Sequence, residues 1–205
     1  MNLLSLIVDI AAADGPCPNG TRAQAGSGTG LAETLCVLPD GSVAMRSTVE
    51  PPGFRTDSSL RSGKLHGPYR AWFLNGTLKT EGFYADGKKQ GIWYEYGVDG
   101  RIRTMTSFKD DVRDGIEIRY SESGDLRWLS FSREGRIVTL REFDSPTEYW
   151  EFAYDQAGVR ERATVYDRKT NSPTCELFQD GAGGWKVQTG KCDSRFAHDL
   201  LLGLL

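Results

Sequence analysis

Short runs of aromatic and aliphatic residues alternate with polar turns along the middle of the chain. Tyr69–Leu74 is followed by the pair Asn75-Gly76 and then by the second run, Leu78–Tyr84. Asn-Gly between two apolar runs is a strong β-hairpin signal, because both residues tolerate positive φ. Residues 85–88 then turn the chain into the next run. No helical period occurs within 67–138, so the pattern predicts an all-β antiparallel meander of hairpins.

The hairpin pattern repeats every 24 residues, beginning at Gly67, Gly91 and Gly115. The same spacing relates three polar-Gly turns, an aromatic position, an aliphatic position followed by a base, and an acidic position. These are Asn75-Gly76, Asp99-Gly100 and Ser123-Gly124; Trp72, Tyr96 and Tyr120; Leu78-Lys79, Ile102-Arg103 and Leu126-Arg127; and Asp86, Asp110 and Glu134. A fixed period of roughly 20–50 residues indicates a repeat architecture, with two strands in each unit.

The repeat becomes less regular toward both ends. Asp40-Gly41 resembles the turn of an earlier unit, displaced by an insertion at residues 50–53. Downstream, Tyr149–Tyr154 with Ala157-Gly158 repeats the strand and turn, and Asp180-Gly181 is the expected last turn. Terminal repeats are atypical because they cap the stack.

The expected fold is a single twisted sheet or an open solenoid with atypical ends. We expect five segments: a weak signal-like or disordered N-terminus (1–16), a Cys-bearing cap (17–66), three repeats (67–138), degenerate repeats with a C-terminal cap (139–192), and a tail (193–205). The pattern leaves open which sheet face is the core. A two-residue loop places Trp72 and Lys79 on one face, and one more loop residue reverses this assignment.

The repeat resembles the MORN-type repeat of bacterial proteins, in the variant found in YwqK-type antitoxin-like proteins. The resemblance covers GPYRAWFLNGTLKTEGFYADGKKQ and GIWYEYGVDGRIRTMTSFKDDVRD, within 67–138. The third unit departs from it, because Glu117 replaces the aromatic of Tyr69 and Trp93. The resemblance implies a Gly-rich antiparallel sheet that binds or scaffolds, without catalysis. The antitoxin role is a weaker implication, since fold does not determine function.

Composition supports short strands and tight turns. Glycine accounts for 24 of 205 residues, about 12% against a usual ~7%. The net charge is −3 with both signs mixed, so the chain as a whole does not supply the basic face that a nucleic-acid binder needs, and only a local basic patch is left open. The chain has only two histidines, His66 and His198. These are too few to favour a His-based metal site or a catalytic dyad.

The four cysteines form two pairs near the chain ends, and we favour the disulfides Cys17–Cys36 and Cys175–Cys192. The segment inside the first pair has few apolar side chains to bury and needs a covalent link to become ordered. Other connectivities are possible, and the alternative is four buried thiols in a cytoplasmic protein. Leu3–Val8 followed by Ala11–Ala13 is a weak signal-like segment. No run reaches the ~18 apolar residues of a membrane span. We therefore expect a periplasmic, envelope-associated or secreted protein.

Motifs for chemistry are weak. Gly26–Gly30 is Gly-rich but lacks the strand and helix of a phosphate-binding loop, and Lys109–Gly115 lacks EF-hand spacing. We therefore expect no enzyme, cofactor, metal or small-molecule ligand. The aromatics in successive strands and two turn arginines are the candidate protein-binding residues: Tyr69, Trp72, Phe73, Trp93, Tyr94, Tyr96, Arg101 and Arg103. The competing interpretation is that these rings form the core of a thin sheet.

The leading hypothesis is a non-enzymatic β-repeat interaction or scaffold protein, antitoxin- or immunity-like if its partner is a toxin. The alternative is an envelope structural or lipid-surface module, in which Lys88, Lys89, Arg101 and Arg103 contact anionic headgroups.

Overall fold

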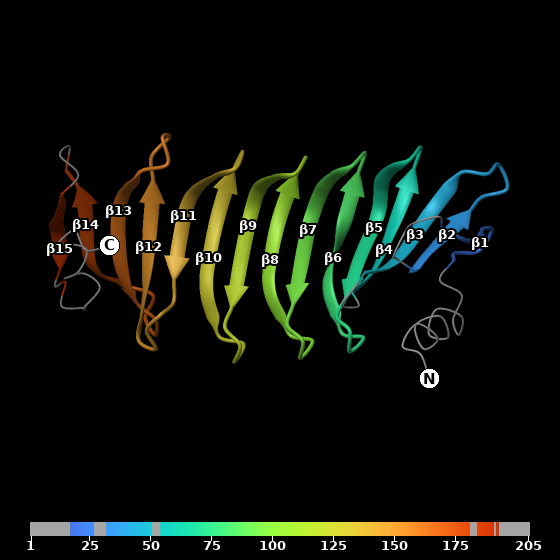
Figure 1. Cartoon of the computed structure of the whole chain (residues 1–205). Coiled ribbons are helices and arrows are strands. Elements are labelled where there is room, and N and C mark those ends of the chain that lie inside the picture. The colour runs from blue at the N-terminus through green and yellow to red at the C-terminus, as the bar shows by residue number, and fades with distance from the viewer. Residues whose placement is uncertain (1–16, 27–31, 51–53, 181–183, 191, 193–205) are drawn as a thin grey trace. The chain divides into compact units, whose positions relative to one another are not determined.

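The structure, a computed structural model, describes residues 17–26, 32–50, 54–180, 184–190 and 192 (Figure 1). Every regular element in these ranges is a β-strand, which confirms the all-β prediction. The strands are β1 (Arg22–Ala25), β2 (Ala32–Val37), β3 (Val43–Glu50), β4 (Phe54–Arg61), β5 (Lys64–Trp72), β6 (Leu78–Ala85), β7 (Lys88–Tyr96), β8 (Ile102–Lys109), β9 (Val112–Tyr120), β10 (Leu126–Arg133), β11 (Arg136–Glu142), β12 (Glu148–Tyr154), β13 (Arg160–Asp167), β14 (Pro173–Gln179) and β15 (Trp185–Gly190). The signal-like segment 1–16, most of the Gly-rich loop, part of the predicted insertion (51–53) and the tail 193–205 lie outside the described residues.

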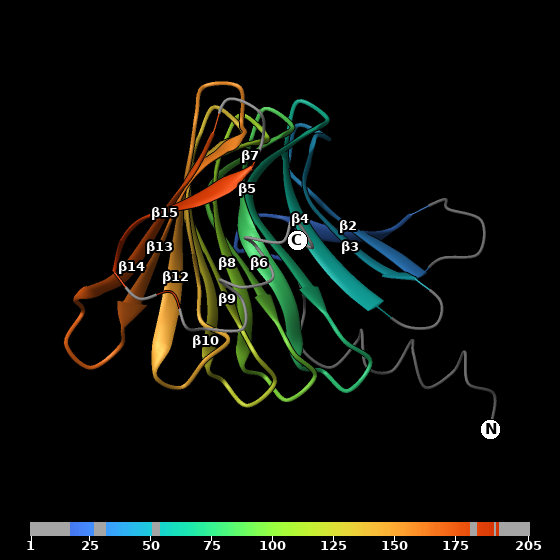
Figure 2. The same cartoon turned by 90° about the vertical axis from the view of Figure 1, so that its left-hand side faces the viewer.

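The strands form one antiparallel sheet whose spatial order is the chain order, β1 to β15. Neighbouring strands in sequence are neighbours in the sheet, as in the paired residues Thr56, Ala71 and Thr80 of β4, β5 and β6. The predicted meander is therefore confirmed. Figure 2 shows the short turns that join successive strands at the two ends of the strands. We call these two rows of turns the two edges of the meander.

One edge carries two-residue turns in which both residues have positive φ. Asp86 (50°) and Gly87 (89°) make such a turn, and Ser62-Gly63 and Asp110-Asp111 repeat it at a spacing of 24. These are type I′ turns, whose twist matches that of the flanking strands. Backbone hydrogen bonds link them, since Gly87 N donates to Leu65 O and Asp111 N donates to Lys89 O. The 24-residue period therefore recurs as a repeated turn-to-strand hydrogen bond.

The opposite edge of the first repeat carries a longer loop than its Asn75-Gly76 pair suggests. Gly76 N donates to Phe73 O at 2.9 Å and Phe73 N donates to Thr77 O at 2.8 Å. The loop therefore spans three residues, and only Gly76 has positive φ (81°). This is a turn closed by a glycine in the left-handed region. The three-residue loop sets the register between β5 and β6, which the sequence left open, and pairs Trp72 with Leu78.

The predicted phase of the outer repeats, meaning which of the two edges carries each polar-Gly pair, is wrong. The turns at Asp40-Gly41 and Ala157-Gly158 are present, whereas Gly181 of the expected last turn lies outside the described residues. Asp40-Gly41 joins β2 to β3, whereas Asn75-Gly76 joins β5 to β6. Successive turns of a meander alternate between edges, so these two turns lie at opposite edges. In the second half, Ala157-Gly158 and Ser123-Gly124 are also at opposite edges. Polar-Gly turns occur at both edges here, so turn composition alone does not reveal the phase.

The chain divides into two compact units. The first comprises Met1–Arg103 and Phe108–Asp111, and the second comprises Thr104–Ser107 and Val112–Leu205. In the second unit the core is one face of the sheet, where Leu140, Phe152, Ala163 and Leu177 are paired across four strands and are almost fully buried. We call this side the Phe152 face. The first unit is built around aromatic rings, described below.

Both predicted disulfides are present and include all four cysteines. Cys17 and Cys36 have Cα atoms 5.3 Å apart, and those of Cys175 and Cys192 are 5.2 Å apart. Cys36 and Cys175 are buried. Two disulfides are compatible with an oxidising, extracellular compartment. Within the described part of the chain, no helix is long and apolar enough to cross a bilayer.

Candidate interaction surface

One face of the first unit, here the Trp93 face, holds a packed aromatic cluster. The Trp93 ring lies 4.9 Å from Tyr84, 5.6 Å from Tyr69 and 6.5 Å from Phe108, centroid to centroid. Lys89 Nζ lies 4.4 Å above the Trp93 ring, in cation–π geometry. Trp93 is only 4% exposed. Trp93 is therefore the core ring of the unit, and the half-buried rings of Tyr69, Tyr84 and Phe108 pack around it.

Gly82 packs directly against the Trp93 ring of this cluster. A Cβ atom at this position would lie 2.7 Å from Trp93 Cγ and closer still to Cδ2 and Cε2. The backbone of Gly82 is not in the left-handed region. The glycine is therefore required for close approach of the indole ring to β6, and not for a turn.

The opposite face, here the Tyr94 face, carries aromatic and charged side chains together. The strand register places Asp57, Arg70, Glu81 and Tyr94 in one row across β4 to β7. Alternation along β5 and β7 adds Trp72 and Tyr96, and Arg55 is paired with Trp72. The Tyr94 face is thus defined by Arg55, Asp57, Arg70, Trp72, Glu81, Tyr94 and Tyr96.

Ion pairs hold the arginines of the Tyr94 face in place without burying them. Arg55 Nη2 lies 2.8 Å from Asp57 Oδ2, and the Arg55 guanidinium lies 4.9 Å from the Trp72 ring centroid. Arg70 Nε lies 3.4 Å from Glu81 Oε2. The Arg55 and Arg70 side chains are 44% and 57% exposed. Both guanidinium groups therefore remain accessible to a partner.

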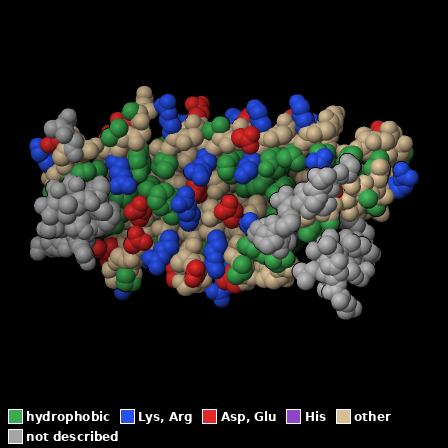
Figure 3. Space-filling view, viewed as in Figure 1, with side chains coloured by type: hydrophobic (Ala, Val, Ile, Leu, Met, Phe, Trp, Pro, Cys, Tyr) green, Lys and Arg blue, Asp and Glu red, His purple; other side chains and the backbone are tan. Residues whose placement is uncertain are grey.

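The tyrosines of this face are tied to the same charges. Tyr96 Oη donates to Glu81 Oε1 at 2.8 Å, and the Tyr94 and Tyr96 rings lie 6.4 Å apart. Burial and then the hydrogen bond to the Glu81 carboxylate raise the pKa of Tyr96 to about 12. Its hydroxyl stays protonated at physiological pH and holds the Glu81 side chain. The Tyr94 face carries two positive and two negative groups, Arg55 and Arg70 against Asp57 and Glu81. Figure 3 shows Lys and Arg side chains interspersed with Asp and Glu side chains over one face of the molecule.

The structure separates the eight predicted binding residues. Tyr69 and Trp93 pack in the Trp93 cluster, whereas Trp72, Tyr94 and Tyr96 share the Tyr94 face. The three others lie near turns: Phe73 with Lys79 Nζ 5.9 Å from its ring, and Arg101 and Arg103 beside Asp99. Sequence reasoning missed Arg55, Asp57, Arg70 and Glu81, because only the register brings them to these aromatics.

The basic residues proposed for lipid contact are mostly engaged within the protein. Arg103 Nη2 lies 3.0 Å from Asp99 Oδ2, and Arg101 Nε lies 3.9 Å from the same oxygen. Lys89 covers Trp93, and Lys88 is exposed beside the turn that follows β6. These groups do not form a strong cationic patch.

The second unit has its own aromatic and charged surface, opposite its Phe152 face. Tyr149 stacks between Tyr166 at 4.9 Å and Phe143 at 5.2 Å. Arg141 Nε lies 2.6 Å from Glu151 Oε2, and its guanidinium lies 5.5 Å from the Tyr149 ring centroid. Tyr149 is buried, so the accessible parts of this ladder are the half-buried rings of Phe143 and Tyr166 and the ion pair.

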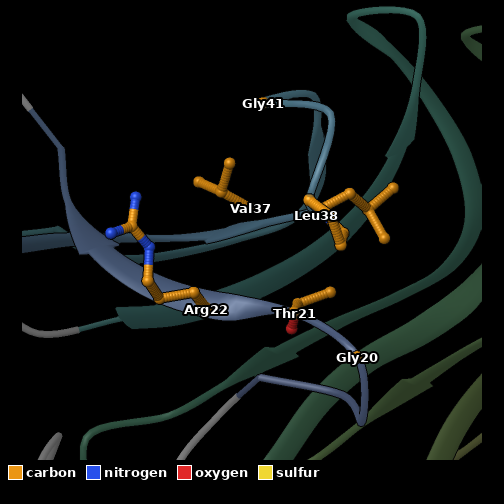
Figure 4. A pocket seen from close by; sticks show the side chains of 7 residues that line it. Gly20, Thr21, Arg22, Val37, Leu38 and Gly41 are labelled. Carbon is orange, nitrogen blue, oxygen red and sulfur yellow. The ribbon is translucent and has the colours of Figure 1, made fainter.

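A shallow hollow of about 370 Å³ lies near the N-terminal disulfide (Figure 4). Thr21 and Arg22 line it from one side, and Val37, Leu38 and Gly41 line it from the other. Over the ranges that the structure describes, no group of three or more His, Cys, Asp or Glu side chains could hold a metal ion. The Tyr94 face, which combines three aromatic rings with two accessible arginines, is the candidate interaction surface.

Comparison with known proteins adds no identification. No family model matches the chain. A search of curated proteins also finds no match. The resemblance to MORN-type repeats therefore stays a prediction.

Proposed function

We propose that the chain is a non-enzymatic β-repeat interaction protein that binds a protein partner through the Tyr94 face. The observation that carries this proposal is the group Trp72, Tyr94 and Tyr96, half-buried beside two accessible arginines. Aromatic residues and arginine are enriched among the residues that dominate binding energy at protein interfaces. The ion pairs also hold these side chains in place, which lowers the entropy lost on binding.

The Trp93 face supports this choice by contrast. Its rings are packed against each other and against Gly82, so they stabilise the unit. A sheet with one packed aromatic face and one accessible aromatic–arginine face can fold and bind through different side chains. If the partner is a toxin, the protein is an antitoxin or immunity protein, as the MORN-type resemblance implies.

The proposed location is the periplasm, the cell envelope or the extracellular space, supported by the two disulfides. In the envelope, the alternative function is a structural or lipid-surface module. Co-sedimentation with anionic vesicles tests that alternative. The pairing of Arg101 and Arg103 with Asp99 leads us to expect weak binding that is lost at moderate salt.

The test of the proposal uses matched variants of the full oxidised chain as baits in an extract of the native host, followed by affinity measurement with the purified partner. Tyr94→Ala and Arg70→Glu alter the Tyr94 face, whereas Glu95→Ala alters an exposed side chain of the Trp93 face. We expect the first two to weaken binding by about ten-fold or more and the third to leave it unchanged. Equal binding by all three variants would reject the Tyr94 face.

A further inference from the structure

The chain contains two Asn-Gly pairs, Asn19-Gly20 and Asn75-Gly76, and both asparagines are exposed in turns. This dipeptide can modify itself without an enzyme. The backbone nitrogen of the glycine attacks the asparagine Cγ, and a residue without a Cβ hinders that attack least. The two sites have the same chemistry, so their surroundings decide which one reacts.

The reacting groups of Asn75 are held by hydrogen bonds. Asn75 Nδ2, the leaving group, donates to Val98 O at 3.2 Å, and Asn75 Oδ1 accepts from Thr77 N at 3.0 Å. The attacking nitrogen, Gly76 N, donates to Phe73 O at 2.9 Å. The attack requires rotation of the side chain and of the peptide unit. At this site such rotation breaks all three hydrogen bonds.

At Asn19 the same groups form no hydrogen bond with any described residue. The turn is closed one residue later, where Thr21 N and Thr21 Oγ1 both donate to Pro18 O, at 3.2 and 2.6 Å. Among the described residues, neither the Asn19 side chain nor Gly20 N takes part in a hydrogen bond. Gly20 has a φ of 87° and open space around its Cα. Attack at this site therefore breaks no hydrogen bond within the described structure.

We propose that Asn19 is a site of spontaneous deamidation and isomerisation, and that Asn75 is protected by its turn. The Gly20 N–Cγ bond forms, the Cγ–Nδ2 bond breaks, and ammonia leaves with the proton of the Gly20 amide. Water then opens the succinimide at either carbonyl, which gives an aspartyl or an isoaspartyl residue. The net change is the exchange of a neutral amide for a carboxylate.

The modification changes the edge of the hollow between β1 and the turn after β2. Figure 4 shows Gly20, Thr21 and Arg22 in succession along its wall. A carboxylate formed at Asn19 adds a negative charge three residues before Arg22, whose side chain lines the hollow. The Cys17–Cys36 disulfide begins two residues before Asn19, so it keeps the turn attached to β2 in either isomer.

The test follows both asparagines in one sample of the full oxidised chain, incubated in mildly alkaline buffer. Trypsin cleaves after Arg22, Arg70 and Lys79, so the two sites fall on separate peptides. Mass spectrometry measures conversion of the amide to the acid, and labelling by an isoaspartyl methyltransferase detects the isomer. The Asn19→Gln variant should remove the N-terminal signal.

We expect Asn19 to convert about ten-fold or more faster than Asn75 in the folded protein, the factor that one retained hydrogen bond supplies. In concentrated urea the two rates should converge, because both turns are lost. Equal rates in the folded protein, or faster conversion of Asn75, would overturn the proposal. So would an Asn19 that reacts only in urea.

Discussion

Gly82→Ala tests whether the Trp93 cluster depends on close approach of an indole ring to the backbone. The added Cβ would lie 2.7 Å or less from three ring atoms of Trp93, whereas carbon atoms rest about 3.5–4.0 Å apart. The ring must therefore move by about 1 Å. Tyr69, Tyr84 and Lys89 surround it at 4.4–5.6 Å, so it cannot move without displacing them.

The expected cost follows from two opposing effects. Overpacking of this kind costs about 1–3 kcal/mol. Replacing glycine by alanine restricts the unfolded chain and returns about 0.4–1 kcal/mol. The net expectation is a loss of about 1–2 kcal/mol in the free energy of unfolding. Urea denaturation followed by tryptophan fluorescence measures this loss.

Two controls identify the cause. Gly184→Ala introduces a Cβ no closer than 3.4 Å to its neighbours, at a backbone position outside the left-handed region, and should be neutral or slightly stabilising. In a Trp93→Leu background the clash with the ring is absent, so Gly82→Ala should cost nothing. A stable Gly82→Ala variant would refute this reasoning, as would a loss that persists without the indole ring.

Three further predictions concern charge, hydrogen bonding and the disulfides. Burial raises the pKa of the Glu142 carboxyl; Arg160 lowers it and Asp144 raises it, each to a smaller extent. The free energy of unfolding of the wild-type protein should therefore increase as pH falls through that raised pKa. Glu142→Gln should flatten this pH dependence and raise the melting temperature at neutral pH. Tyr96→Phe removes the hydrogen bond to Glu81 and should cost about 1 kcal/mol in urea denaturation. Because the pKa of Tyr96 is raised to about 12, the stability from its protonated hydroxyl should be complete below the ordinary tyrosine pKa and lost as pH rises from there through about 12. An unchanged alkaline stability profile in Tyr96→Phe would contradict this assignment. The oxidised protein should show no titratable thiols, and reduction should destabilise it by about 3 kcal/mol per disulfide; four thiols in the native fold would contradict the pairing.

The internal period of the chain was sufficient to predict the meander. Each hairpin is specified by its own turn and its own apolar runs, so the information is local. Asp86-Gly87 and Asn75-Gly76 each form one turn, and turns of these two kinds recur at a spacing of 24 residues. The disulfide pairing was also accessible from sequence, because each cysteine pair closes a short segment near one end of the chain.

The candidate site was only partly predictable. Sequence reasoning selected Trp72, Tyr94 and Tyr96 together with Tyr69 and Trp93, although the two groups lie on opposite faces. The loop after Phe73 has three residues and not two, and the strands carry irregularities in pairing near Trp72 and Phe83. A shift of one residue exchanges the two faces of a strand. Arg70 and Glu81 were missed for the same reason, since they become neighbours only through the pairing of β5 with β6.

The sequence by itself therefore determined the fold class and the chain-order meander, because turn preferences act within one hairpin. It favoured the two cysteine pairs, which the structure then showed. Only the tertiary structure decided which aromatic rings pack on Gly82 and which remain beside accessible arginines. That choice depends on register and on close approach between strands, and both are properties of several strands together.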